Sequence, residues 1–132
     1  MIALDTSVLA RYILNDTPSE REIADQLIAG SSCAVSWSVL VELCWVLEFS
    51  VRLPRSKVVI ALRIIADTDQ ITNPNDDLLI WAIDRYARGA DFADMVHLAS
   101  ALSGADEFVC FDRKLARQAG SQTPIAVRIL RA

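Results

Sequence analysis

Four acidic side chains lie where this chain is otherwise apolar. Asp5 and Asp112 each end a short apolar run, Glu42 interrupts another, and Asp94 shares a predicted helical face with apolar residues. A charged carboxylate away from water is strongly disfavoured unless it is paired or bound to a metal ion. Four such groups in one cleft would repel one another until a divalent cation neutralised them. The set therefore indicates a metal-dependent phosphoryl-transfer or nuclease site.

Each acid also has a purely structural explanation. Asp5 and Asp112 both precede predicted helices, so either carboxylate could serve only as a helix cap. The hydroxyls of Thr6 and Ser7 could orient Asp5 by hydrogen bonding. Glu42 is harder to explain in this way, because no lysine or arginine lies three or four residues away on its helix. We interpret the four acids together as a site.

Two further groups lie near Asp94. Asp91 stands three residues before it, at the start of the same predicted helix, so one of the two aspartates is expected to cap that helix and the other to act as a ligand. His97, the single histidine, follows Asp94 by three residues, a spacing that can bind a metal. A lone histidine among apolar residues is more often a packing residue, so His97 is left out of the predicted site.

Length and composition indicate one soluble domain over residues 1–132. The apolar fraction of 53% exceeds the usual ~45–50%, so part of the apolar surface is expected to cover a partner. No uncharged run reaches the ~20 apolar residues that a membrane span requires, and the chain starts without a basic leader. We therefore expect a cytoplasmic protein with no membrane association.

Cysteine usage and charge narrow the chemistry. The three cysteines are odd in number and form no Cys-x-x-Cys pair, so we expect neither a zinc site nor a disulfide framework. We expect the cysteines to be reduced thiols in the core. The net charge of −4 hides its distribution: without the four acids of the predicted site, basic and acidic residues balance. The most suggestive basic group directly follows Asp112 and consists of Arg113, Lys114 and Arg117.

Periodicity and turn residues predict alternating strands and helices. Such alternation is typical of an α/β fold with a mainly parallel sheet covered on both faces. Ligands of these sheets bind beyond the carboxyl ends of the strands, where Asp5 and Asp112 are expected. The predicted strands are 1–5, 33–36, 70–72, 107–111 and 125–129, and the predicted helices are 6–15, 17–30, 38–50 (capped by Ser38), 56–66, 75–88, 91–103 and 113–119.

Four segments of the chain resemble PIN-domain ribonucleases, and in particular VapC-type toxins of bacterial toxin–antitoxin pairs. They are residues 1–9, 36–42, 90–99 and 108–116, and they follow one another in the order and at the spacing of that family. The resemblance covers nearly the whole chain. It implies a three-layer α/β/α sandwich with a mainly parallel central sheet, and a Mg²⁺- or Mn²⁺-dependent endoribonuclease that hydrolyses RNA phosphodiester bonds.

The resemblance also implies residue roles. The acidic quartet of the family falls on Asp5, Glu42, Asp94 and Asp112, which would be both the catalytic residues and the metal ligands. Possible supporting residues are Thr6, Ser7, Asp91 and Arg113. The chain departs from the family pattern at Ser7, where asparagine is common, and at Cys110, where threonine is common. The second change is expected to weaken a hydrogen bond to Asp112.

The mechanism that the resemblance implies uses a metal-bound water to attack phosphorus in line, with the metal stabilising the charge on the phosphate oxygens. Asp5, Asp94 and Asp112 would be the main ligands, and Glu42 would bind a second metal or orient the water. The family also implies a homodimer and a cognate antitoxin protein. The apolar helices 38–50 and 56–66 are the surfaces expected for these contacts.

Other functions remain as alternatives. A metal-dependent phosphatase would normally carry a second aspartate two residues after the first, and residues 5–7 lack it. A receiver-type domain would need two acids after the first strand and a late lysine, and both are missing. The remaining alternative is a non-catalytic RNA- or protein-binding module that retains the PIN fold. The sequence leaves open which RNA is cut and whether one or two ions bind.

Overall fold

Every strand pair in the structure is parallel. The computed structural model describes all 132 residues, and its first sheet has the strand order β1 (Ile2–Ala3), β2 (Cys33–Ala34), β3 (Ile71–Thr72). A second sheet pairs β4 (Glu107–Cys110) with β5 (Ala126–Ile129). The parallel pairing and the alternation of strands with helices confirm the predicted α/β class.

The chain forms two compact units, Met1–Pro74 and Asn75–Ala132. The first contains β1 to β3, and the second contains β4 and β5. The predicted helices are found with ends that agree within two residues. In the first unit they are α1 (Thr6–Ile13), α2 (Pro18–Ala29), α3 (Trp37–Trp45) with the π-helical turn η1 (Val46–Ser50), and α4 (Arg55–Asp67). In the second they are α5 (Asp76–Ala87), α6 (Phe92–Ala101) and α7 (Arg113–Ala119).

The start of α3 differs from the prediction. Ser36, not Ser38, is the N-cap: its backbone is extended and its hydroxyl accepts a hydrogen bond from the Val39 amide at 3.3 Å. Ser38 lies inside the first turn, where its hydroxyl is hydrogen-bonded to that of Ser36 at 3.0 Å. Ser36 is the cap because its backbone is still extended after β2, as an N-cap requires.

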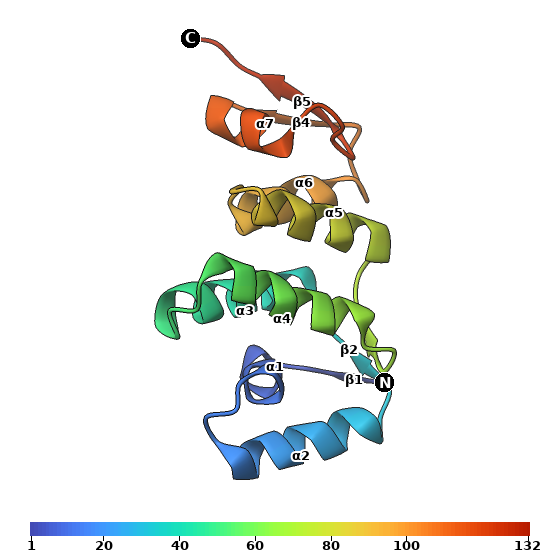
Figure 1. Cartoon of the computed structure of the whole chain (residues 1–132). Helices are drawn as coiled ribbons and strands as arrows, with labels where there is room; N and C mark the ends of the chain where they lie inside the picture. Colours follow the sequence, from blue (N-terminus) through green and yellow to red (C-terminus); the bar gives the residue numbers. More distant parts are fainter. The chain divides into compact units, whose positions relative to one another are not determined.

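In the first unit, α1 packs against α2 and α3, and α3 packs against α4 (Figure 1). Its core is built from leucines that are fully buried, among them Leu9, Leu40, Leu43 and Leu62. In the sheet register Ile2 lies opposite Cys33 and Ala3 opposite Ala34. Because the strands are parallel, the residues that follow β1 and β2 start their helices at the same edge of the sheet.

In the second unit, α5 packs against α6, and α6 contacts both β4 and α7. The rings of Tyr86 and Phe92 meet edge to face with centroids 5.9 Å apart. As expected, Gly89 follows the end of α5; its φ of 105° lies in the left-handed region that glycine adopts without strain. This turn brings the chain directly into the start of α6.

Part of the apolar excess lies on the surface of the first unit. Trp45 and Phe49 are 57% and 59% exposed, with ring centroids 6.0 Å apart, and Ile60 and Ile64 are exposed one turn apart on α4. No helix has the length and apolar character needed to cross a membrane. All three cysteines are free; two are buried as predicted, while Cys110 is partly exposed.

Candidate active site

Asp5 caps α1 and is held there by its neighbour Ser7. The Asp5 Oδ2 atom accepts hydrogen bonds from the Ser7 amide at 3.1 Å and from the Ser7 hydroxyl at 2.7 Å. These bonds favour the ionised carboxylate and lower its pKa from the ordinary value; the side-chain bond has the largest effect. The hydroxyl of Thr6, which was expected to help, is buried without a hydrogen-bond partner. Ser7 alone supplies the hydroxyl that orients Asp5.

Glu42 lies on α3, and no ion pair joins its carboxylate to another residue of its unit. The residues on either side in the helical face, Leu40 and Leu43, are fully buried, whereas Glu42 itself is exposed. The helix therefore directs the carboxylate toward solvent while its neighbours enter the core.

The apolar sequence context of the four acids predicts that their carboxylates are buried, and this prediction is wrong for three of the four. Asp5, Glu42 and Asp112 are exposed, and Asp94 is half-buried. The physical reason is that Asp5 and Asp112 stand one step beyond the apolar runs, at helix starts where the chain reaches the surface. Their apolar sequence context describes the neighbouring residues and not the carboxylates themselves.

In the second unit, three carboxylates lie at the starts of α6 and α7 and two of them act electrostatically on the third. We call Asp91, Asp94 and Asp112 the acidic cluster. The charges of Asp91 and Asp112 both raise the pKa of Asp94, after the larger effect of desolvation. His97 and Lys114 oppose this shift with weaker positive charge. The ionised form of Asp94 is therefore disfavoured by its partial burial and by its two acidic neighbours.

Asp91 is the cap of α6, which decides which of the two aspartates has that role. The Asp91 Oδ1 atom accepts a hydrogen bond from the Asp94 amide at 2.9 Å. Because Asp91 makes this bond, the Asp94 side chain does not cap the helix, although it lies in the first turn. In the predicted pair of one cap and one ligand, Asp94 is thus the carboxylate available to a ligand.

Asp112 caps α7, and its carboxylate is held by backbone groups. Its Oδ1 atom accepts hydrogen bonds from the amides of Lys114 at 2.9 Å and Leu115 at 3.1 Å. The Cys110 thiol donates to the backbone carbonyl of Asp112 at 3.6 Å and not to the carboxylate. The Asp112 carboxylate is therefore held by the two amides, and no hydrogen bond joins it to the Cys110 thiol.

Two residues that sequence reasoning missed fix the position of this cluster. The Gln118 side chain accepts a hydrogen bond from the Asp91 amide at 3.3 Å and donates one to the Gly89 carbonyl at 3.4 Å. The Arg85 Nε donates to the Gln118 carbonyl at 2.7 Å. These bonds tie the end of α7 to the start of α6. They join residues 27 to 33 positions apart, so no local pattern could have revealed them.

The donor set of these acids fits a hard divalent cation. Ionised carboxylates supply oxygen ligands only, which suit Mg²⁺ or Mn²⁺ rather than softer metals. The excess negative charge around Asp94 is what a cation would neutralise. Neither unit alone groups three or more His, Cys, Asp or Glu side chains so as to hold a metal ion. Mg²⁺ does not require such a cage, because it keeps several waters and commonly uses one or two carboxylates.

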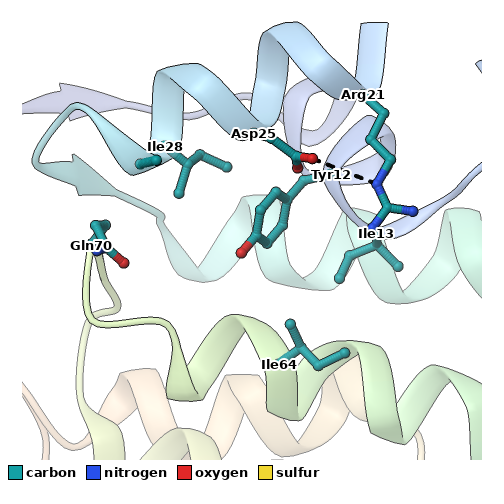
Figure 2. Close-up of a pocket in the computed structure, with 8 residues that line it drawn as sticks. Tyr12, Ile13, Arg21, Asp25, Ile28, Ile64 and Gln70 are labelled. Carbon is teal, nitrogen blue, oxygen red and sulfur yellow. Dashed lines mark ion pairs between the residues drawn. The ribbon is translucent and has the colours of Figure 1, made fainter. Parts of the chain in front are cut away.

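A separate hollow in the first unit lacks this chemistry. Figure 2 shows it, with the ion pair between Arg21 and Asp25 at one side and the Tyr12 ring in the middle. The guanidinium is paired with the carboxylate at 3.8 Å, and none of the four predicted acids lines the cavity. It is lined by Tyr12, Ile13, Arg21, Asp25, Ile28, Ala29, Ile64 and Gln70.

Comparison with known protein families yields one decisive match. The family model described as PIN domain matches residues 2–121, a span that includes all four predicted acids. The chain belongs to the PIN-domain family. Comparison with curated proteins finds no match.

PIN domains are generally nucleases, so membership indicates a nuclease-type hydrolase that acts on nucleic acid. PIN-domain nucleases also generally use divalent metals, in agreement with the oxygen donors of the acids. The predicted α/β PIN-like fold is thereby confirmed. For this PIN domain, the structure adds the hydrogen bonds that orient Asp5, Asp91 and Asp112 at the starts of three helices.

Replacing Ser7 with alanine should raise the pKa of Asp5 toward its ordinary value of 3.8, because both the largest cause of its lowering and part of the cap geometry are lost. Since the folded pKa is lowered, the stabilisation is present at neutral pH and is lost as the pH falls through the folded pKa. A carboxyl titration followed by NMR measures the shift. Ser19→Ala, an exposed serine at the start of α2, is the matched control and should leave Asp5 unchanged.

Replacing Asp94 with asparagine should raise the melting temperature at neutral pH in metal-free buffer. The change removes a carboxylate whose ionisation is opposed by desolvation and by Asp91 and Asp112. A raised folded pKa makes Asp94 a source of stability that declines as the pH rises above 3.8, so the gain should be smaller in acid. Thermal unfolding in EDTA tests this, with the exposed Asp106→Asn as control. A lower melting temperature for Asp94→Asn would contradict the charge argument.

Proposed function

We propose that this PIN domain is a Mg²⁺- or Mn²⁺-dependent endoribonuclease and the toxin of a cytoplasmic type II toxin–antitoxin pair. The observation that carries the proposal is the carboxylate of Asp94, whose ionised form is disfavoured beside Asp91 and Asp112 at two helix starts. A charge of this kind lowers the stability of the free protein, and a bound cation would offset the repulsion between the carboxylates.

Asp5, Asp94 and Asp112 are proposed as the main metal ligands, and Glu42 as the residue that binds a second ion or orients the attacking water. Asp5 and Asp112 are held in place by hydrogen bonds at the helix caps, so their free oxygen atoms keep a defined direction. Glu42 is exposed and without an ion pair, so its carboxylate is available to accept a proton or a hydrogen bond from water. A bound divalent ion supplies an acidified water and stabilises charge on the phosphate oxygens.

The order of the acids along the chain supports a common role. Residues 2–121 match the PIN domain as one continuous family unit, and the match includes Asp5, Glu42, Asp94 and Asp112. We therefore propose that residues 1–132 act as a single nuclease domain. RNA is the proposed substrate because the four segments of the sequence resemble ribonucleases within that family.

Exposed apolar side chains support the proposed homodimer and antitoxin. Trp45 and Phe49 at the end of the α3–η1 helix and Ile60 and Ile64 on α4 present large apolar groups to solvent. Helix α4 packs against both α3 and η1, so these groups belong to one packed region of the first unit. Surface aromatic groups in such number are typical of a protein contact.

Replacing Asp5 or Asp94 with asparagine should abolish RNA cleavage while the protein stays folded, because each substitution removes a negatively charged oxygen ligand. The loss should exceed ~100-fold, the scale on which removal of charge stabilisation affects hydrolysis. Gel analysis of an RNA substrate with Mg²⁺ or Mn²⁺ measures the rate, and circular dichroism checks the fold. Asp106→Asn serves as the charge-matched control. Cleavage at the wild-type rate by Asp94→Asn would rule out its role as a ligand.

The same variants separate the nuclease from a non-catalytic binding module. Mn²⁺ should raise the melting temperature of the wild-type protein, because a ligand that binds only the folded state stabilises it. Asp94→Asn should lose that increase, although its metal-free stability is higher. A wild-type protein that binds RNA without any response to Mn²⁺ and without cleavage would favour the binding module.

Substituting Trp45 and Phe49 with serine should weaken protein association, because each change removes an exposed aromatic ring from the proposed contact surface. Analytical ultracentrifugation of the purified chain should show a dimer that the double variant loses, and co-expression with a short upstream gene should yield a complex. Ile23→Ser, an exposed apolar change on α2, is the control. A wild-type monomer that copurifies with no small protein would contradict the toxin assignment.

A further inference from the structure

All the charged residues among the last twenty of the chain are basic. Residues 113–132 contain Arg113, Lys114, Arg117, Arg128 and Arg131 but no aspartate or glutamate, although the whole chain has a net charge of −4. The change of sign is abrupt, because Asp112 directly precedes the segment. The C-terminal segment is thus a local region of positive charge in an acidic protein, and local charge decides which partner is attracted.

The fold gathers four of these five side chains around one groove. Helix α7 contacts β5, and the groove between them is lined by Arg113 and Arg117 from the helix, Arg128 from the strand and Arg131 from the segment after it. Its volume is about 800 Å³. The remaining lining residues are Ala116, Val127 and Ile129, so arginines and apolar side chains share the lining of the groove.

Most of this positive charge is uncompensated. Arg128 forms an ion pair with Glu107, with its Nη2 atom 2.8 Å from the carboxylate oxygen. Arg113, Arg117 and Arg131 are exposed and have no acidic partner in the structure of the second unit. Arg113 and Arg117 are four residues apart on α7, so both guanidinium groups lie on the same side of the helix. Three free guanidinium groups along one groove are suited to an extended polyanion.

We propose that this groove, which we call the α7–β5 groove, binds the sugar-phosphate backbone of single-stranded RNA. Arginine forks hold phosphate oxygens by paired, charge-assisted hydrogen bonds, and the apolar side chains of the lining do not demand a particular base. The inference rests on the proposed function and extends it by naming the surface that holds the substrate.

Electrostatics explains why the nuclease needs such a surface beside its acids. The acidic cluster repels the phosphates of any approaching RNA, and Asp112 belongs to it. Because α7 begins directly after Asp112, RNA held along the α7–β5 groove is attracted on one side of that carboxylate. The favourable phosphate contacts offset the repulsion and bring the strand to the acids.

The test compares two double variants that each remove two positive charges. Arg117→Gln with Arg131→Gln removes two of the four arginines that line the groove. Arg21→Gln with Arg63→Gln removes two arginines from α2 and α4 of the first unit, away from the groove. Fluorescence anisotropy with a labelled single-stranded RNA in EDTA measures binding without cleavage. The groove variant should bind about tenfold more weakly at low salt, and its slope of log K against log salt should fall by about 1.4. The control should bind like the wild type.

Kinetics then separate failure of the groove from failure of the proposed function. With Mg²⁺, the groove variant should show a raised KM and an unchanged kcat. The reason is that the lost contacts bind parts of the RNA that are distant from the phosphate at which cleavage occurs. If the wild type cleaves RNA and the groove variant matches it in binding and KM, the groove serves another partner, such as an acidic protein segment, and the inference is overturned. If the wild type neither binds nor cleaves RNA, the proposed function falls with it.

Discussion

The interaction on which this structure depends is the capping of helices by aspartates at the points where extended chain turns into helix. The first amides of a helix have no partner within it, and a carboxylate that accepts them stabilises the helix by about 1 kcal/mol. Asp5, Asp91 and Asp112 each make this contact, with amide-to-oxygen distances between 2.9 and 3.1 Å. The same bonds that begin the helices hold the carboxylates in fixed positions.

Capping also has an electrostatic consequence for function. A carboxylate that accepts amide or hydroxyl hydrogen bonds stays ionised, as the lowered pKa of Asp5 illustrates. Asp94 is different, because its oxygens are not used in a cap and its pKa is raised, first by desolvation and then by the charges of Asp91 and Asp112. The PIN domain thus combines carboxylates that are held rigidly with one that is electrostatically unsatisfied, an arrangement that favours a divalent cation.

The charge distribution supports the same function at larger scale. An acidic cluster alone would repel nucleic acid, and the net charge of the chain would do so as well. The charged side chains of the C-terminal segment that follows Asp112 are all positive. The effect of this segment depends on β5, because pairing with β4 anchors the strand that carries Arg128 beside α7. The pairing of β4 with β5 therefore also positions one of the arginines that line the α7–β5 groove.

The sequence by itself determined the order and type of the elements and several candidate caps, because hydrophobic periodicity and capping preferences act over only a few residues. For that reason Asp5 and Asp112 could be considered as possible caps and Asp91 as one of two candidates, and membership of the PIN-domain family confirmed the α/β fold. The sequence assigned the cap of α3 to Ser38, where the structure has Ser36. Tertiary structure alone decided which carboxylates face solvent and how Asp94 is charged, because both depend on packing and on residues distant in the chain. The link from Arg85 through Gln118 to Asp91 has the same origin, since hydrogen bonds between separate helices leave no local pattern.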